Sequence, residues 1–268
     1  MKITVVTVCR NAENCIGETI ESVLRQEYDD YEYLVIDGAS TDNTLNILQS
    51  FEEPFASKNI DFRYISEPDK GIYDAMNKSL DMADGEWILF MNAGDGFFDR
   101  DVLSTVFGND HTGTDVIYGD ILMKDNDHYK LDRAGKPDDQ TDHSPICHQA
   151  MFTRCDVLKE YRFDTGYTLA ADYDTMIRMF KDGRRFKKLD EIISIFEMGG
   201  ASYKQSVDYL KQIYISREKN SIVSTKNFRS EAIKLRTYMS VRNICRKCIG
   251  PVFYSDKRGW HCDKNSCK

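Results

Sequence analysis

Short apolar runs alternate with amphipathic segments through the first 91 residues, and this alternation constrains the fold more than any other feature. Residues with high strand propensity cluster in four runs, at 3–8, 33–37, 62–65 and 86–91. Segments with apolar residues at helical spacing separate these runs, at 15–26, around 45–48 and at 72–83. Strand and helix in strict alternation imply a parallel sheet joined by right-handed crossovers. The pattern therefore predicts an α/β fold with a mostly parallel central sheet and flanking helices.

The second half of the chain is less regular. Three segments have strand character, at 116–123, at 129–131 and within 185–196. Helical spacing returns at 171–180 and again at 206–222. Because no linker rich in proline or glycine interrupts the chain, we predict one domain over residues 1–200 and a helical extension over residues 201–268.

Charge is distributed unevenly between these two parts. The whole chain has 36 Lys and Arg against 44 Asp and Glu, whereas residues 201–268 have 15 against 5. An acidic body with a basic extension suggests two different kinds of partner. The eight cysteines are scattered, the sequence MKITVVTVCRNAENC has no secretory signal, and no apolar run reaches the ~18 residues of a membrane span. We therefore expect a cytoplasmic protein with reduced thiols.

Each of the four early strands ends in polar residues, at 7–11, 37–42, 67–70 and 92–95. In an open α/β sheet these ends meet at one edge, where ligands bind. The first turn has no glycine and the chain has no GxxxxGK[ST] loop, so a phosphate ligand would need a metal ion, Lys or Arg, or a helix N-terminus. Asp95, which follows the buried run Trp87–Met91, has the hard oxygen ligands that a divalent cation prefers.

Several motifs, in this order along the chain, resemble glycosyltransferase family 2, and more narrowly its bacterial polysaccharide and O-antigen branch. They are Val5–Asn11, the DGASTDNT segment at 37–44, the DKGIYDAMNK segment at 69–78 and the NAGD segment at 92–95. The resemblance extends over about residues 1–200. It implies a GT-A fold, a metal-dependent transferase, a nucleotide-sugar donor that is usually a UDP-sugar, and Mg²⁺ or Mn²⁺ as cofactor.

The resemblance also implies roles for individual residues. It assigns to donor binding Thr7, Val8, Cys9, Asn11, Asp37, Lys70, Asn92, Ala93 and Gly94. The same resemblance makes Asp95 the metal ligand. Asn92 and Gly94 stand where the family often has Asp, so Asp95 is the only carboxylate of the motif, and we expect weak metal affinity without the nucleotide.

A later segment, Ala171–Asp174, resembles the family's Glu-Asp-type motif at the start of a helix. We match Asp172 to the catalytic base, although Asp174 remains an alternative and either residue could only cap the helix. The implied mechanism is an inverting single displacement. We further expect residues in the acceptor or sugar pocket, namely His148, Gln149 and Asp74.

The basic extension allows several interpretations. Residues 228–249 predict an amphipathic helix with an apolar face formed by Phe228, Ala232, Leu235 and Met239. Such a helix could contact an anionic membrane, bind nucleic acid or pack on its own domain; we favour the membrane because the body is acidic. A zinc site remains a weaker alternative for the cysteines at 245, 248, 262 and 267.

Together these features predict an inverting glycosyltransferase at the inner face of the plasma membrane. It would move a sugar from a UDP-sugar to a lipid-linked glycan of a surface polysaccharide, such as O-antigen or capsule. The main alternative is an inactive GT-A-like scaffold subunit of an assembly complex. A glycoside hydrolase or a nucleotidyltransferase would leave the nucleotide motifs unexplained or require a phosphate loop that the chain lacks. The donor sugar, the acceptor, the linkage and the oligomeric state are left open by the sequence.

Overall fold

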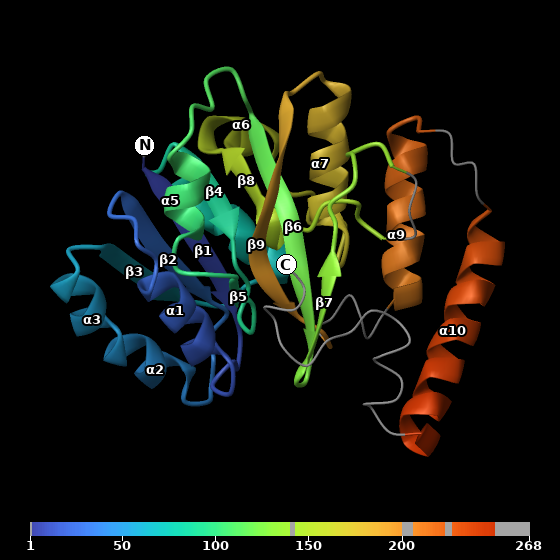
Figure 1. Cartoon of the computed structure of the whole chain (residues 1–268), viewed down its shortest axis with the longest axis horizontal. Helices are drawn as coiled ribbons and strands as arrows, with labels where there is room; N and C mark the ends of the chain where they lie inside the picture. The colour runs from blue at the N-terminus through green and yellow to red at the C-terminus, as the bar shows by residue number, and fades with distance from the viewer. Residues whose placement is uncertain (1, 140–142, 200–205, 223–226, 250–268) are drawn as a thin grey trace.

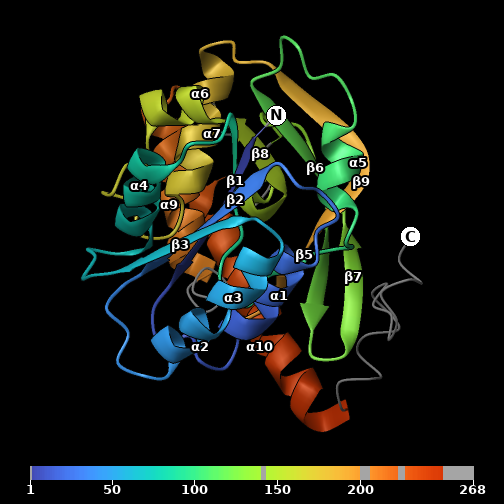
Figure 2. The same ribbon diagram turned by 90° about the vertical axis from the view of Figure 1, so that its left-hand side faces the viewer.

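The computed structural model describes residues 2–139, 143–199, 206–222 and 227–249, which form an α/β domain with a central sheet between helices (Figures 1 and 2). The first half contains five strands: β1 (Ile3–Cys9), β2 (Tyr31–Asp37), β3 (Asp61–Ser66), β4 (Trp87–Phe90) and β5 (Gly96–Phe97). It also contains five helices: α1 (Ile16–Leu24), α2 (Thr44–Ser50), α3 (Glu52–Ser57), α4 (Ile72–Met82) and α5 (Val102–Phe107). The alternation predicted from the sequence is confirmed here, with shifts of one or two residues at the ends.

The second half completes the sheet and adds helices to it. Its strands are β6 (Val116–Asp125), β7 (His128–Asp132), β8 (Met151–Arg154) and β9 (Phe186–Glu197). A single 3₁₀ turn, η1 (His148–Ala150), precedes β8. The helices are α6 (Cys155–Tyr161), α7 (Ala171–Lys181), α9 (Ser206–Lys219) and α10 (Phe228–Ile249).

In the described residues the strands form one sheet of order β3-β2-β1-β4-β8-β6-β9-β5, with β7 paired to β6. β1 to β4 are parallel, β8 is antiparallel to both β4 and β6, and β9 is again parallel to β6. The carboxyl ends of β1, β2, β3, β4, β6 and β9 consequently lie at one edge. The predicted GT-A fold with a mostly parallel sheet is confirmed. β8 was not predicted, because four residues are too few to display a periodicity.

The inner strands are buried on both faces, as their apolar runs predict. On β1, Val5 packs with the helix α1 side of the core, whereas the next residue, Val6, packs with α4 on the opposite face. Both valines have no exposed surface. Burying a side chain of this size contributes about 1.5–3 kcal/mol, so the two layers hold the strand ends in fixed positions.

The first helix of the extension packs directly on the domain. Arg217 of α9 is 1% exposed, and its Nε donates a hydrogen bond of 2.8 Å to the hydroxyl of Tyr173 on α7. The guanidinium also lies over the rings of Tyr173 and Tyr214. Because α7 carries the predicted catalytic base, α9 helps to fix the position of that helix.

The helix predicted over residues 228–249 is present as α10, and it lies beside α9 (Figure 1). Its predicted apolar face turns toward α9: the ring centroids of Phe228 and Tyr214 are 5.6 Å apart, and Ala232 is only 8% exposed. The opposite side carries Ile233, which is 65% exposed. The face that the sequence analysis assigns to a membrane is therefore covered, at least in its first turns, by the protein's own helix.

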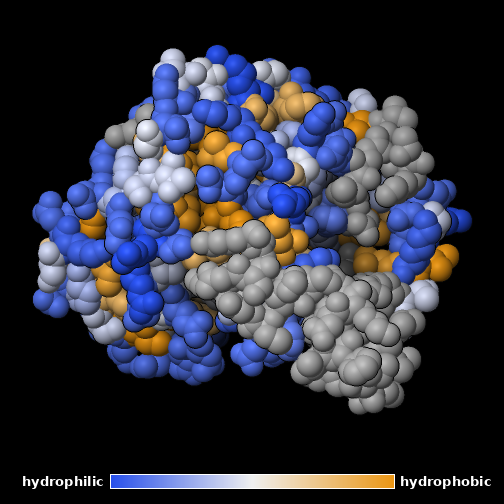
Figure 3. Space-filling view, in the orientation of Figure 1, coloured by the Kyte–Doolittle hydropathy of each residue, from blue (hydrophilic) through white to orange (hydrophobic). Residues whose placement is uncertain are grey.

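Hydrophilic side chains cover most of the face in Figure 3, and apolar side chains reach the surface near its centre. Within the described residues, no helix is both long and apolar enough to cross a membrane. The predicted zinc site lies outside the part of the chain whose side chains the structure describes, since this part excludes the cysteines at 245, 248, 262 and 267.

Candidate functional site

The loops that follow β1 and β2 are joined by hydrogen bonds at the carboxyl edge of the sheet. Asn11 has a φ of 51°, its backbone N–H donates to Ser40 Oγ at 2.7 Å, and its Oδ1 accepts a bond of 2.9 Å from the Thr41 N–H. The Ala12 N–H donates to Thr44 Oγ1 at 2.9 Å. These contacts give the predicted donor-binding loop a defined shape without any ligand.

The side chain of Asp37 is fully buried at the end of β2. It accepts hydrogen bonds from the Ser40 N–H at 2.9 Å, from Ser66 Oγ at 2.6 Å and from the Ser40 hydroxyl, and the Cys9 thiol lies 3.7 Å away. Burial raises the pKa of that thiol, and the negative charge of Asp37 adds to the effect. Cys9 therefore stays protonated at neutral pH.

The predicted residues on β1 are largely internal. Val8 is 5% exposed and Thr7 is fully buried, with its hydroxyl donating to the Met91 carbonyl at 2.7 Å. The Thr7 contact ties β1 to the end of β4. Any contact of these two residues with a nucleotide would have to come from their backbone, as the sequence analysis expects.

The segment after β3 approaches the end of β2 closely. A Cβ atom at Gly38 would lie 2.3 Å from Asp69 Oδ2, so any larger residue there would require the Asp69 side chain to move. Asp74, at the start of α4, accepts the Lys70 N–H at 3.0 Å and lies 3.9 Å from Lys78 Nζ. The Lys70 side chain is exposed. Asp74 thus shapes this loop, and Lys70 is available to a ligand.

Asp95 follows the buried strand β4 through a tight turn. The Asp95 N–H donates to the Asn92 carbonyl at 3.0 Å, and Gly94 has a φ of +100°, which favours glycine. Thr19 of α1 holds the turn from below: its hydroxyl donates to the Asp95 carbonyl at 2.7 Å and accepts the Gly94 N–H at 2.9 Å. The sequence analysis did not include Thr19, because a buried threonine on a helix carries no distinctive signal.

The carboxylate of Asp95 is 6% exposed and held at both oxygens. Oδ2 accepts a hydrogen bond of 2.7 Å from Gln149 Nε2, and Oδ1 accepts one of 3.0 Å from the Glu197 N–H at the end of β9. Burial raises the pKa of Asp95 to about 6, although both hydrogen bonds act in the opposite direction. At neutral pH the two hydrogen bonds therefore do not fully offset the cost of burying the ionised carboxylate.

Asp172 lies in the first turn of α7 and is bound by two side chains. Tyr73 of α4 donates to its Oδ1 at 2.8 Å, and His148 Nδ1 lies 2.8 Å from its Oδ2. Burial alone would raise the pKa of Asp172, but the hydrogen bonds from His148 and Tyr73 outweigh that effect and hold the pKa below its usual value. The carboxylate is therefore ionised over the whole neutral range.

Asp174, the alternative base, has a different environment. It is fully buried, and it forms an ion pair with Arg178 at 2.8 Å and accepts a bond of 2.8 Å from Ser216 Oγ on α9. Asn220 adds a further hydrogen bond at 3.2 Å. These contacts join α7 to α9, whereas Asp172 faces His148 and the end of β4.

The structure brings five of the predicted residues into one cluster: Asn92, Asp95, His148, Gln149 and Asp172. His148 Nε2 lies 3.0 Å from Asn92 Nδ2, and Gln149 Oε1 lies 2.7 Å from Cys147 Sγ. Gln149 is 2% exposed. The sequence analysis missed the contributions of Tyr73 and Cys147; Tyr73 stands inside the DKGIYDAMNK motif, which was the available signal.

The surroundings of Asp95 fit a divalent cation that is held mainly by its nucleotide. In the described residues no Lys or Arg forms an ion pair with this buried carboxylate, and no group of three or more His, Cys, Asp or Glu side chains could hold a metal by itself. A bound cation would supply the missing positive charge. Diphosphate oxygens and water would have to provide its remaining ligands.

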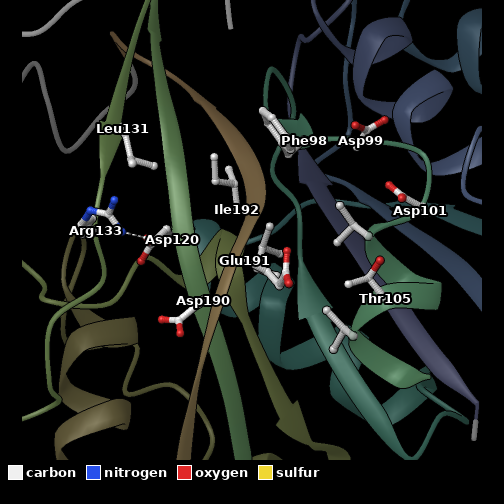
Figure 4. A pocket seen from close by; sticks show the side chains of 13 residues that line it. Phe98, Asp99, Asp101, Thr105, Asp120, Leu131, Arg133, Asp190, Glu191 and Ile192 are labelled. Atoms are coloured by element: carbon white, nitrogen blue, oxygen red, sulfur yellow. Dashed lines mark hydrogen bonds and ion pairs between the residues drawn. The ribbon is translucent and has the colours of Figure 1, made fainter. Parts of the chain in front are cut away.

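A separate hollow of about 320 Å³ lies between α5 and the strands β6, β7 and β9 (Figure 4). Its lining is strongly acidic, with Asp99, Asp101, Asp120, Asp190 and Glu191; Arg133 also lines it and forms an ion pair of 3.5 Å with Asp120. None of the predicted site residues lines it. The hollow lies on a face of the sheet and not at the strand ends, so we place the functional site at the cluster around Asp95 and Asp172.

Comparisons with known proteins identify the family of the chain. The family model described as "Glycosyl transferase family 2" matches residues 4–193. A "PGL/p-HBAD biosynthesis glycosyltransferase" of Mycobacterium bovis is 32% identical over 197 residues, covering 72% of this chain and 75% of the relative. "Putative glycosyltransferase EpsE" of Bacillus subtilis is 27% identical over 218 residues, covering 78% and 77%.

Solved structures share the fold at lower identity. TarS 1–349 of S. aureus in complex with UDP-GlcNAc superimposes with a TM-score of 0.65 at 16% identity, covering 86% of this chain and 69% of that one. The mannosyltransferase PcManGT of Pyrobaculum calidifontis, in complex with GDP-Man and Mn²⁺, gives 0.64 at 18% identity, covering 86% and 68%. The family model covers well over half of the chain, and its matched span includes both Asp95 and Asp172. The chain therefore belongs to glycosyl transferase family 2.

Proposed function

We propose that the protein is an inverting glycosyltransferase that moves a sugar from a UDP-sugar to an acceptor hydroxyl. One observation carries the proposal. A buried carboxylate that no Lys or Arg of the described residues pairs with, Asp95, and an ionised carboxylate, Asp172, are both bound by one turn, η1, at the carboxyl edge of the sheet. This is where α/β sheets bind nucleotides. The two structural neighbours described above were solved with UDP-GlcNAc and with GDP-Man, which supports a nucleotide-sugar donor.

In this mechanism Asp172 is the general base. It accepts the proton of the acceptor hydroxyl, whose oxygen attacks the anomeric carbon in line as the bond to the diphosphate breaks. The hydrogen bonds from Tyr73 and His148 keep the carboxylate ionised and directed. Inversion at the anomeric carbon follows from a single displacement.

The donor is held at the strand ends. We assign the nucleoside to the loops of Asn11 and Asp37, with Lys70 toward the phosphates. Asn92 Oδ1 is buried and has no hydrogen-bond partner in the described part of the chain, so it is available to a hydroxyl of the donor. Asp95 would hold Mg²⁺ or Mn²⁺, which, when bound, stabilises negative charge on the leaving diphosphate.

A lipid-linked glycan of a surface polysaccharide remains the proposed acceptor, used at the cytoplasmic face of the plasma membrane. The mycobacterial and Bacillus relatives are described as glycosyltransferases, which supports the reaction class. The alternative, an inactive GT-A-like scaffold, is favoured only by Asn92 and Gly94, which leave the motif with a single carboxylate.

Binding and hydrolysis of a panel of nucleotide-sugars test the proposal. Purified protein is offered UDP-, GDP- and dTDP-sugars with Mn²⁺ or with EDTA, and both binding and release of the nucleoside diphosphate are measured. We expect one UDP-sugar to bind in a metal-dependent way and to be hydrolysed slowly when water replaces the acceptor. Binding without turnover on any lipid-linked acceptor would favour the scaffold, and no nucleotide binding with any metal would contradict the transferase.

Membrane contact is now assigned to the outward side of α10. The exposed side chains on this part of the helix include Ile233 and the basic residues Arg229, Lys234 and Arg236. Each such charge near an anionic surface contributes about 1 kcal/mol. Replacing these three basic residues by Gln should weaken co-sedimentation with phosphatidylserine vesicles by roughly 100-fold. Unchanged sedimentation, or equal binding to neutral phosphatidylcholine vesicles, would contradict this surface.

A further inference from the structure

We propose that the dipeptide His148-Gln149 is a positioning element that holds both functional carboxylates, the base through His148 and the metal ligand through Gln149. The inference rests on the proposed function and adds residues that act through others, without contact to the substrate. Its starting point is the η1 turn, in which neighbouring side chains bind carboxylates from two distant parts of the chain, β4 and α7.

The hydrogen bond to Asn92 fixes the tautomer of His148. An amide nitrogen can only donate, so Asn92 Nδ2 at 3.0 Å requires a lone pair on His148 Nε2. The imidazole proton is then on Nδ1, which donates to Asp172 Oδ2 at 2.8 Å. His148 is consequently a neutral donor that directs the carboxylate. Its Nε2 lone pair already accepts the Asn92 N–H, so it is not free to take the proton of the acceptor hydroxyl.

A second hydrogen bond likewise orients the side-chain amide of Gln149. Its Oε1 lies 2.7 Å from the thiol of Cys147, which fixes Nε2 toward Asp95 Oδ2, also at 2.7 Å. Burial raises the pKa of the Cys147 thiol well above its usual value, so Cys147 remains a donor at neutral pH. Each carboxylate is thus bound by a side chain that is itself oriented by a further hydrogen bond. Asn92 orients His148, which binds Asp172, and Cys147 orients Gln149, which binds Asp95.

This arrangement sets the separation between the carboxylates of Asp95 and Asp172. Because His148 and Gln149 are adjacent in one turn, a displacement of η1 would move both partners together. Contacts of this supporting kind typically change metal affinity or activity by about 10–100-fold. We call the bond from His148 to Asp172 the base arm and the bond from Gln149 to Asp95 the metal arm. Loss of the two arms should give different phenotypes, since one acts on the base and the other on the metal ligand.

The base arm is tested with three substitutions. In His148→Asn the amide nitrogen takes the place of Nδ1, whereas in His148→Gln it takes the place of Nε2. We expect His148→Ala and His148→Gln to lower turnover of the UDP-sugar by about 10–100-fold, with recovery in His148→Asn and with the Kd for UDP and Mn²⁺ unchanged in all three. Equal losses in the Asn and Gln variants would overturn this arm.

The metal arm is tested with Gln149→Leu. We expect the Mn²⁺ concentration for half-maximal UDP binding to rise by about 10–100-fold, while turnover at saturating Mn²⁺ stays near that of the wild type. Cys147→Ala should give a smaller shift in the same direction. Each arm is the other's control: if His148→Ala and Gln149→Leu both lowered turnover and metal affinity together, the turn would merely be misfolded and the two-armed assignment would be wrong.

A measurement on the unmodified protein separates this inference from the proposed function. The ¹⁵N shifts of the His148 ring, assigned by comparison with His148→Gln, should report a proton on Nδ1 and a lone pair on Nε2. A ring protonated on Nε2 alone would overturn the base arm whether or not the protein turns over any sugar. A wild-type protein that binds no nucleotide would overturn the proposed function and the metal arm with it, while the ring measurement would still decide the base arm.

Discussion

Replacing Asp172 with asparagine is expected to lower turnover by about 10²–10⁴-fold and to leave donor binding intact. The amide has the shape of the carboxylate but cannot accept the proton of the attacking hydroxyl. Asp172 makes no contact with Asp95 or with the loops of Asn11 and Asp37, so the Kd for UDP and Mn²⁺ should change less than twofold. Stopped assays of UDP release and calorimetry of UDP binding measure the two quantities separately.

Asp174→Asn is the matched control, because it makes the same chemical change two residues away on the same helix. Asp174 is fully buried between Arg178 and Ser216. Its replacement should cost about 1–3 kcal/mol in the free energy of unfolding, with turnover per folded molecule near the wild-type value. The opposite pattern, with chemistry lost in Asp174→Asn and kept in Asp172→Asn, would reassign the base.

Replacing Asp95 with asparagine is expected to abolish metal-dependent UDP binding and at the same time to stabilise the protein without ligands at pH 7.5. The folded pKa of Asp95 is about 6, above the ordinary 3.8, because burial disfavours the ionised form. The native state therefore binds more protons than the unfolded state between these two values, and its stability falls as the pH rises through that window. Burying the ionised Asp95 lowers the free energy of unfolding by roughly 3 kcal/mol above about pH 6 and has no such effect below pH 3.8.

Asparagine removes this cost but loses one acceptor, since only one of its two polar atoms can accept from Gln149 or from the Glu197 N–H. That loss is worth about 1 kcal/mol, so we expect a net gain of roughly 1–2 kcal/mol at pH 7.5 and none at pH 4. Urea unfolding at the two pH values measures it. A variant less stable than the wild type at pH 7.5 would show that the buried carboxylate is compensated by a group other than a bound cation.

The elements that the sequence predicts are those whose apolar residues recur at clear strand or helix spacing. The strands β1 to β4 and the helices α1 and α4 follow from apolar runs and helical spacing. β8 escapes prediction because its residues, Met151–Arg154, contain no pattern, and α6 follows it immediately. Its antiparallel direction depends on pairing with β4 and β6, which local propensity does not contain.

For the site, topology predicts the positions but not the contacts. The end of a parallel strand had to bring Asp95 to the carboxyl edge, near the end of β2 with Asp37. The bonds from Gln149 to Asp95 and from Tyr73 to Asp172 join residues 54 and 99 positions apart, so only the folded chain reveals them. The resemblance to a family favours Asp172 as the base, with Asp174 as the alternative, and the structure shows that the two carboxylates have different environments.

The central place of β8 also has a consequence for the order in which the chain can assemble during synthesis. β4 ends at Phe90, yet its second neighbour in the sheet is β8, which begins at Met151. Until the ribosome has released β8, one side of β4 offers unpaired backbone groups in the middle of the future sheet. β6 has the same requirement for β8, and it needs β9 as well, which ends at Glu197. The nascent N-terminal half therefore has an unpaired, aggregation-prone strand edge until β8 has been made, and β6 stays incomplete until β9 follows.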